Sequence, residues 1–170
     1  MRKLSPVLSV GTLRLLYSSL VLSHLTYGVE IWGGSARTER NSLISVQNKC
    51  VKFLIGGGND VLSDVYKCNN LLPFVDIHRF YTLLRFKRYL LNDHFFLVDK
   101  LSQMQHNHDH LTRFSTAGNF TVHPINLSIY FNSFFHQGVK MYNDLPSNIK
   151  EVNNLQSYRK LLKTHLASNV

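Results

Sequence analysis

The segment at residues 15–29 contains no Asp, Glu, Lys or Arg, and this uncharged run limits what the chain can fold into more than any other feature. It is shorter than the roughly 20 apolar residues that a membrane-spanning helix needs, and its serines and its histidine make it too polar for one. Its leucines recur on most sides of a helix, which is typical of a helix in the centre of a globular core. We therefore predict a central helix over residues 12–27, with Leu20 and Leu25 buried.

Helical spacing of apolar residues continues along the chain and predicts an all-α fold. The expected helices cover residues 36–55, 63–68, 77–91, 96–104, 133–142 and 155–166, with a single helical turn at 147–152. Ser63, Asp76 and Ser147 are the side chains expected to cap helix N-termini. The glycine triplet at residues 56–58 follows a helix rather than a strand, so we interpret it as a helix end and not as a phosphate-binding loop.

A polar stretch without a helical period, residues 105–126, predicts an irregular loop. We therefore expect three parts: a helical domain at residues 1–104, a loop or mobile linker at 105–132 and a C-terminal helical segment at 133–170. The predicted architecture is a helical bundle with a C-terminal helical hairpin that the irregular loop joins to it.

Two of the expected helices are amphipathic, which predicts the side that each one buries. On the second helix the predicted core face is Leu43, Val46, Cys50 and Leu54, with Ile44, Val51 and Ile55 alongside. The opposite face is Asn41, Ser45, Asn48, Lys49 and Lys52. On the last helix the predicted core face is Leu155, Tyr158, Leu162 and Leu166, and the opposite face is Gln156, Arg159, Lys160 and Lys163. Cys50 is then a small buried residue. Because Cys68 is the only other cysteine, a reducing intracellular compartment is expected, either nucleus or cytoplasm.

The charge balance favours a polyanionic partner. The 170 residues carry a formal net charge of +9, while a hydrophobic content of 44% and a charged content of 17% are typical of a globular protein. Nucleic acid and an anionic membrane surface both attract such a chain, and many basic proteins bind neither. Because no segment is apolar enough to cross a bilayer, we expect no membrane partner, whereas charge alone leaves a nucleic-acid partner and an ordinary basic surface both open.

Three groups of basic residues are the predicted nucleic-acid-binding residues. They are the pairs Lys49 with Lys52 and Arg85 with Arg88, each one helical turn apart, and the cluster of Arg159, Lys160 and Lys163. Such groups suit phosphate contacts, which supply affinity without sequence preference. The alternative for all of them is ordinary solvated helix surface.

No pattern in the sequence predicts catalysis. The chain has no adjacent pair of aspartates and no Gly-x-Ser-x-Gly motif, so we expect no catalytic residue and no cofactor. His106, His108 and His110 alternate, so on a strand they would share a face and hold a metal ion, whereas in a loop they are polar surface residues. We predict no metal there. His24 is interpreted as a core or interface histidine, and Trp32 as a core anchor rather than a platform for stacking bases.

Three short segments, in this order, resemble the C-terminal part of reverse transcriptases from LINE-type, Jockey-like non-LTR retrotransposons. They are LVLSHLTYGVEIW at residues 20–32, QNKCVK at 47–52 and the tail GVKMYNDLPSNIKEVNNLQSYRKLLKTH at 138–165. The family usually has Trp in the tail where this chain has Tyr142. The resemblance implies the thumb and post-thumb region, which follows the polymerase palm.

The resemblance also implies a function. It points to a fragment of an RNA-directed DNA polymerase that binds RNA or RNA–DNA template–primer duplex without sequence preference and meets the palm in a longer protein. The family's paired catalytic aspartates belong to the palm and have no counterpart here, so we expect the chain alone to be inactive. Two other interpretations stay open: a helical protein-interaction domain without a nucleic-acid role, and a relic of a degraded element.

Overall fold

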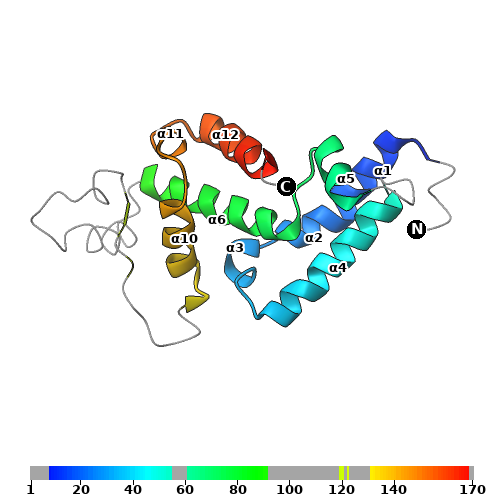
Figure 1. Ribbon diagram of the computed structural model, residues 1–170, viewed down its shortest axis with the longest axis horizontal. Helices are drawn as coiled ribbons and strands as arrows, with labels where there is room; N and C mark the ends of the chain where they lie inside the picture. The colour runs from blue at the N-terminus through cyan, green and yellow to red at the C-terminus, as the bar shows by residue number, and fades with distance from the viewer. Residues whose placement is uncertain (1–7, 55–60, 92–118, 121, 123–130, 169–170) are drawn as a thin grey trace, which may run out of the picture. The chain divides into compact units, whose positions relative to one another are not determined.

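A computed structural model describes residues 8–54, 61–91, 119–120, 122 and 131–168, and these residues form an all-α fold without any strand among them (Figure 1). The predicted fold class is therefore confirmed. The helical elements are α1 (Val10–Tyr17), the π-helical turn η1 (Ser18–Leu22), α2 (Ser23–Thr26), α3 (Val29–Trp32), α4 (Arg37–Leu54), α5 (Leu62–Cys68), α6 (Phe74–Leu91), α10 (Phe134–Asn143), α11 (Ser147–Lys150) and α12 (Leu155–Ser168).

The chain divides into two compact units. The first comprises residues 1–78 and 164–170, and the second comprises residues 79–163. This division differs from the predicted boundaries at residues 104 and 132. The observed boundary at residue 78 lies inside the long helix α6, which continues across it without a change of composition that the sequence could reveal. The predicted helix at residues 96–104, the glycine triplet and most of the predicted loop lie outside the described residues.

The first predicted helix is present as α1, η1 and α2, which follow one another directly. In η1 the Ser23 amide donates to the Ser18 carbonyl five residues back, instead of four. The Ser19 hydroxyl donates to the Leu15 carbonyl at 2.9 Å, which gives that carbonyl a partner at the irregular turn. The extra residue in the turn changes which side chains point inward, so Leu25 is buried as predicted, whereas Leu20 is 50% exposed and its predicted core position is wrong.

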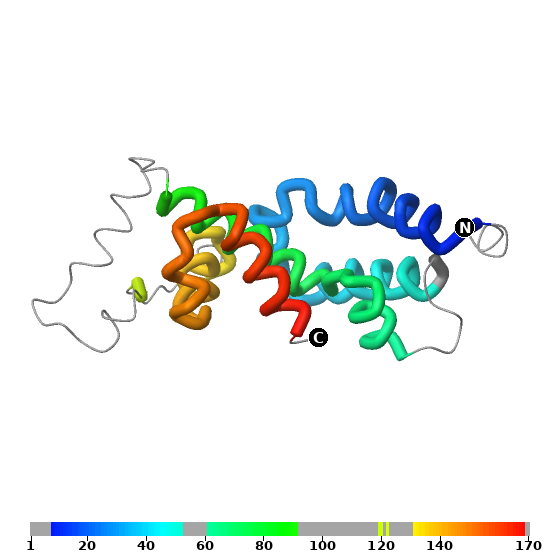
Figure 2. Tube along the Cα trace, turned by 90° about the horizontal axis from the view of Figure 1, so that it is seen from above, coloured from blue at the N-terminus to red at the C-terminus, as the bar shows by residue number. Residues whose placement is uncertain are grey.

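The core of the first unit joins α1, α4 and α5. Its buried residues are Leu13, Tyr17, Val51, Val65 and Tyr66. The helices α1 and α4 run side by side, and α4 also contacts α5, as Figure 2 shows from above. Cys50 is half-buried and packs against this cluster with its thiol free.

The buried side of α4 lies one residue away from the predicted one. Val46, predicted in the core, is 52% exposed, whereas its neighbour Gln47 is fully buried. The Nε2 of Gln47 donates to the Tyr17 hydroxyl at 2.9 Å and to the Leu72 carbonyl at 3.0 Å. These two hydrogen bonds offset part of the cost of removing the side chain from water, whereas its buried Oε1 has no partner among the described residues.

The three predicted N-caps are wrong, because α5 and α6 begin earlier than expected and Ser147 is already the first residue of α11 rather than its cap. Ser63 and Asp76 lie within the first turns of α5 and α6, and Ser147 is the first residue of α11. Before α6 the Pro73 carbonyl accepts from the Ile77 amide, and before α11 the Pro146 carbonyl accepts from the Lys150 amide. A proline has the fixed φ that suits a helix start, so it sets the boundary where no side-chain cap is needed.

The core of the second unit is aromatic. Phe86 of α6, Phe120 and Tyr142 of α10 form a triangle with ring centroids 5.2–5.8 Å apart. Gly138 lets α10 approach α6 closely, since a Cβ at this position would lie 3.2 Å from a ring carbon of Phe86. The helix α10 begins as predicted, and the Ser133 hydroxyl accepts from the His136 amide at its N-terminus.

Candidate nucleic-acid interface

The clearest basic surface of the second unit is the outer side of α12. Tyr158 and Leu162 are fully buried on its inner side, as predicted. On the other side Arg159 and Lys160 are exposed and Lys163 is half-buried. We call these three residues the α12 basic face. The helix itself contains no Asp or Glu, so no carboxylate within α12 offsets these charges.

The N-terminus of α12 is fixed by a side chain that the sequence analysis did not identify. The Oδ1 of Asn154 accepts from the backbone amides of Gln156 at 2.9 Å and Ser157 at 3.1 Å. This is the N-cap arrangement that Asn favours, because it satisfies amides that have no partner within the helix. The cap sets where the helix starts and therefore which residues form the α12 basic face.

The predicted pair on α6 lies on either side of a buried lysine. Arg88 is exposed and Arg85 is half-buried, whereas Lys87 is only 4% exposed. The Nζ of Lys87 lies 5.6 Å from the centre of the Tyr158 ring and donates to the Lys150 carbonyl at 2.7 Å. Lys87 thus connects α6 to α11 and α12. Lys87 lies four residues after the buried Leu83 and therefore on the same side of the helix. This spacing is the sequence signal that could have predicted the burial of Lys87.

A second buried lysine, Lys150, was also missed. Its Nζ donates to the Asn119 Oδ1 at 2.6 Å and to the Asn143 carbonyl at 2.9 Å, and it lies 5.8 Å from the centre of the Tyr142 ring. The Asn143 amide in turn donates to the Phe120 carbonyl at 2.7 Å. Lys150 therefore has a structural role, and no periodicity in the sequence indicates it, because its partners lie up to 31 residues away.

Burial lowers the pKa of both lysines. Removal from water disfavours the charged amine, and this is the cause for Lys87. For Lys150 the same desolvation dominates, and the negative charge of Asp144 partly opposes it. Both amines donate to acceptors within the second unit.

The described part of the second unit is strongly basic. Its basic residues are Arg79, Arg85, Lys87, Arg88, Lys140, Lys150, Arg159, Lys160 and Lys163, against Asp144 and Glu151 as acidic residues. With only Lys87 and Lys150 buried among them, most of this charge is at or near the surface. A surface of this sign attracts polyanions over a range of roughly 8 Å at physiological salt.

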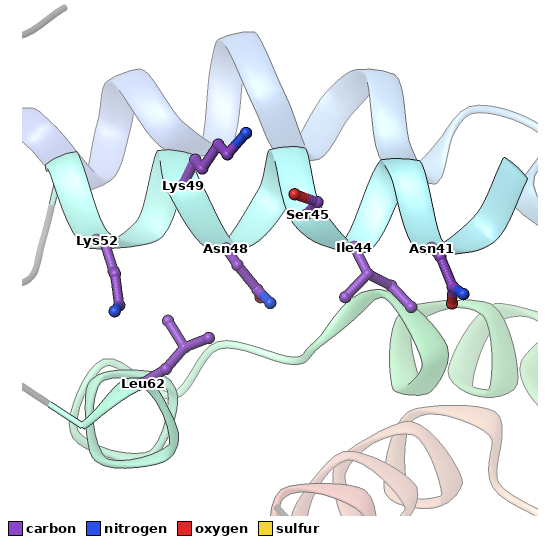
Figure 3. A pocket seen from close by; sticks show the side chains of 7 residues that line it. All are labelled: Asn41, Ile44, Ser45, Asn48, Lys49, Lys52 and Leu62. Atoms are coloured by element: carbon purple, nitrogen blue, oxygen red, sulfur yellow. The ribbon is translucent and has the colours of Figure 1, made fainter. Parts of the chain in front are cut away.

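In the first unit α4 and α5 enclose an open hollow of about 460 Å³, which we call the α4–α5 hollow (Figure 3). The described residues that line it include no Asp or Glu; they are Asn41, Ile44, Ser45, Asn48, Lys49, Lys52 and Leu62. Figure 3 shows that Lys52 and Asn48 extend toward α5, whereas the Lys49 amine points to the other side of α4. Both lysines are exposed, but the structure turns the predicted pair in different directions.

Of the remaining candidates, Trp32 packs against another aromatic ring, whereas Tyr27 and His24 lie at the surface. Trp32 stacks on Phe74 with ring centroids 5.6 Å apart, and its Nε1 donates to the Tyr27 carbonyl at 2.6 Å, as expected for an anchor. Tyr27 itself is 85% exposed. His24 is exposed, which excludes the core position for it, whereas its alternative role as an interface histidine stays a prediction.

The metal hypothesis for His106, His108 and His110 lies outside the described residues. Where the structure is described, no three His, Cys, Asp or Glu side chains gather in a way that could hold an ion.

Among the described helices, none is both long and apolar enough to span a membrane. Comparison with protein-family models, with curated proteins and with solved structures finds no match for this chain.

Proposed function

We propose that this chain is the thumb and post-thumb part of a LINE-type RNA-directed DNA polymerase of a mobile element, and that it binds template–primer duplex through the phosphates. The observation that carries the proposal is the α12 basic face, which turns Arg159 and Lys160 to solvent on a helix without acidic residues. Lysine and arginine on such a face release counterions from nucleic acid when they bind, which favours binding to any sequence.

The residues that carry the resemblance support a shared architecture. Gln47 of the second segment hydrogen-bonds across the first core, and Tyr142 and Gly138 of the tail lie in the second core. They are packing residues rather than site residues, so the resemblance supports a similar fold more directly than a similar surface. Because the chain has no adjacent aspartates, we assign it duplex binding and no nucleotidyl transfer.

The test is fluorescence anisotropy with a labelled RNA–DNA duplex at several salt concentrations. If about three to five phosphates are neutralised, log K should fall against log salt with a slope of roughly −3 to −4.5. Replacing Arg159→Gln and Lys163→Gln together should weaken binding to all sequences and reduce that slope by roughly 2.

The matched control removes the same charge from a different surface. Arg37 and Lys67 are exposed residues of the first unit, so the pair Arg37→Gln with Lys67→Gln should change the slope less than the α12 pair does. Equal effects of the two pairs would assign the binding to net charge alone. Absence of duplex binding by the unmodified chain at low salt would overturn the proposal.

A helical protein-interaction domain is the second candidate. Three large apolar side chains favour it, since Leu15 is 72%, Tyr27 85% and Ile31 77% exposed. Exposed apolar residues of this size mark partner surfaces when they gather into a patch. In a complete polymerase the same side chains would meet the palm, so the duplex-binding test above separates the two candidates, and an upstream reading frame that encodes a palm would support the first.

A further inference from the structure

We infer that the α4–α5 hollow binds one unpaired nucleotide, with its phosphate at Lys52 and its base between the apolar side chains of α4 and α5. The inference deepens the proposed function. It rests on that function for one point, namely that the nucleotide belongs to a nucleic-acid strand. The hollow has a volume of about 460 Å³, within the roughly 300–1,000 Å³ range of sites for small organic ligands.

The lining is suited to an anion at one end. Lys52 is exposed, extends toward α5 and offers three N–H donors to phosphate oxygens. Asn48 lies one helical turn before it and points the same way (Figure 3). The Tyr66 hydroxyl donates to the Asn48 Oδ1 at 2.9 Å, so the amide nitrogen of Asn48 stays available as a donor. Since the described lining residues include no carboxylate, none of them repels a phosphate.

The rest of the lining is suited to a planar ring with polar edges. Ile44 of α4 and Leu62 of α5 supply apolar contact from two helices, as Figure 3 shows. In Figure 3, Asn41 lies at the end of the hollow farthest from Lys52. The two residues are 11 positions apart in sequence, which corresponds to about 16 Å along an α-helix. This length accommodates a phosphate at one end and a base edge at the other, where an Asn amide matches the donor and acceptor of adenine.

An unpaired nucleotide fits this lining better than a base pair. A base inside a duplex is stacked on both faces and paired along its edge, so it cannot meet apolar walls and amides at once. A single-stranded end or a free mononucleotide presents all of these groups. The hollow therefore differs from the α12 basic face, which meets phosphates only.

The experiment uses the full chain with labelled oligoadenylate, with the duplex form of the same oligomer, and with adenosine monophosphate as competitor. The variant Asn41→Ala with Lys52→Gln changes two exposed residues of the lining, so the fold should stay intact. We expect its affinity for the single strand to fall roughly tenfold or more, because a hydrogen bond to a charged group is lost. Its affinity for duplex should fall no more than that of the control.

The matched control is Lys67→Gln, which removes the same charge from an exposed residue of α5 that is not among the described lining residues. Competition by adenosine monophosphate supports a site for any nucleoside phosphate, and single-strand binding without such competition supports the polymer as the source. Equal losses of single-strand affinity in the Lys52 variant and the Lys67 control would overturn the inference. This result is distinct from failure of the proposed function, which would appear as no duplex binding by the unmodified chain.

Discussion

At the scale of single residues, the buried polar side chains determine the most specific features of this protein. Gln47 sits in the centre of the first core and bonds to Tyr17 and Leu72, which are 30 and 25 residues away in sequence. Lys87 and Lys150 have comparable roles in the second unit. Periodicity alone assigns such residues to the surface, because it reports polarity along one helix and not the acceptors that distant segments supply.

Gln47→Ala should reduce the free energy of unfolding by about 2–4 kcal/mol, since it creates a cavity and removes the donor to two buried acceptors. Urea denaturation followed by circular dichroism measures this change. Val46→Ala is the control on the next residue of α4, and because Val46 is 52% exposed, we expect it to change stability by about 0.5 kcal/mol or less. A loss below about 1 kcal/mol for Gln47→Ala would mean that the hydrogen bonds contribute little.

At the scale of helices, the sequence predicted the regular elements well and the irregular ones poorly. The bounds of α4, α10 and α12 agree with the predicted ranges to within about two residues, because each has a regular amphipathic period. The π-helical turn η1 was not predicted, since a single extra residue leaves no distinct pattern in composition. The basic residues of α12 could be placed on its outer side from spacing, whereas the α4–α5 hollow depends on how α5 packs and could not be foreseen.

The π-helical turn has a consequence for stability along the first helix. Leu25 is 7% exposed, so Leu25→Ala should destabilise the protein by about 2–5 kcal/mol. Leu20, on the exposed side created by the turn, is 50% exposed, and Leu20→Ala should cost about 1 kcal/mol or less. Parallel denaturant melts measure both, and similar losses for the two variants would contradict the register that η1 imposes.

At the scale of the whole molecule, both units bury ionisable groups that titrate at high pH. Burial raises the pKa of Tyr17, Tyr66, Tyr142 and Tyr158 above the ordinary value of 10.0. Burial lowers the pKa of Lys87 and Lys150 below the ordinary value of 10.5. The two kinds of group have opposite effects on the pH dependence of stability, because stability rises with pH where the unfolded state binds more protons.

We expect stability to fall as the pH rises above 10.5. A phenol with a raised pKa stabilises the fold fully below pH 10.0, and this contribution is lost above pH 10.0, where the unfolded chain releases its proton first. The buried lysines act in the opposite sense as the pH rises toward 10.5, and above that value they are neutral in both states. Urea melts at stepped pH, with tyrosinate absorbance recorded in parallel, measure the profile.

Tyr158→Phe is the control for this profile. The Tyr158 hydroxyl is buried without a hydrogen-bond partner among the described residues, so its removal should leave stability at neutral pH unchanged or slightly higher. The variant keeps the ring beside the Lys87 amine and removes one of the titrating phenols. Its stability should therefore decline less steeply at alkaline pH, and a decline as steep as that of the unmodified chain would exclude Tyr158 as a contributor.

The continuity of α6 limits how this protein can be divided. The helix supplies Phe74 and Ile77 to the first unit and Leu83 and Phe86 to the second, all of them buried. Starting a helix is the unfavourable step in forming it, and here one such step serves both units. A gene cut at residue 78 would divide the 18 residues of α6 unequally and leave each product with an unprotected helix end. The two units are therefore expected to be inherited, expressed and lost together, rather than exchanged as separate modules.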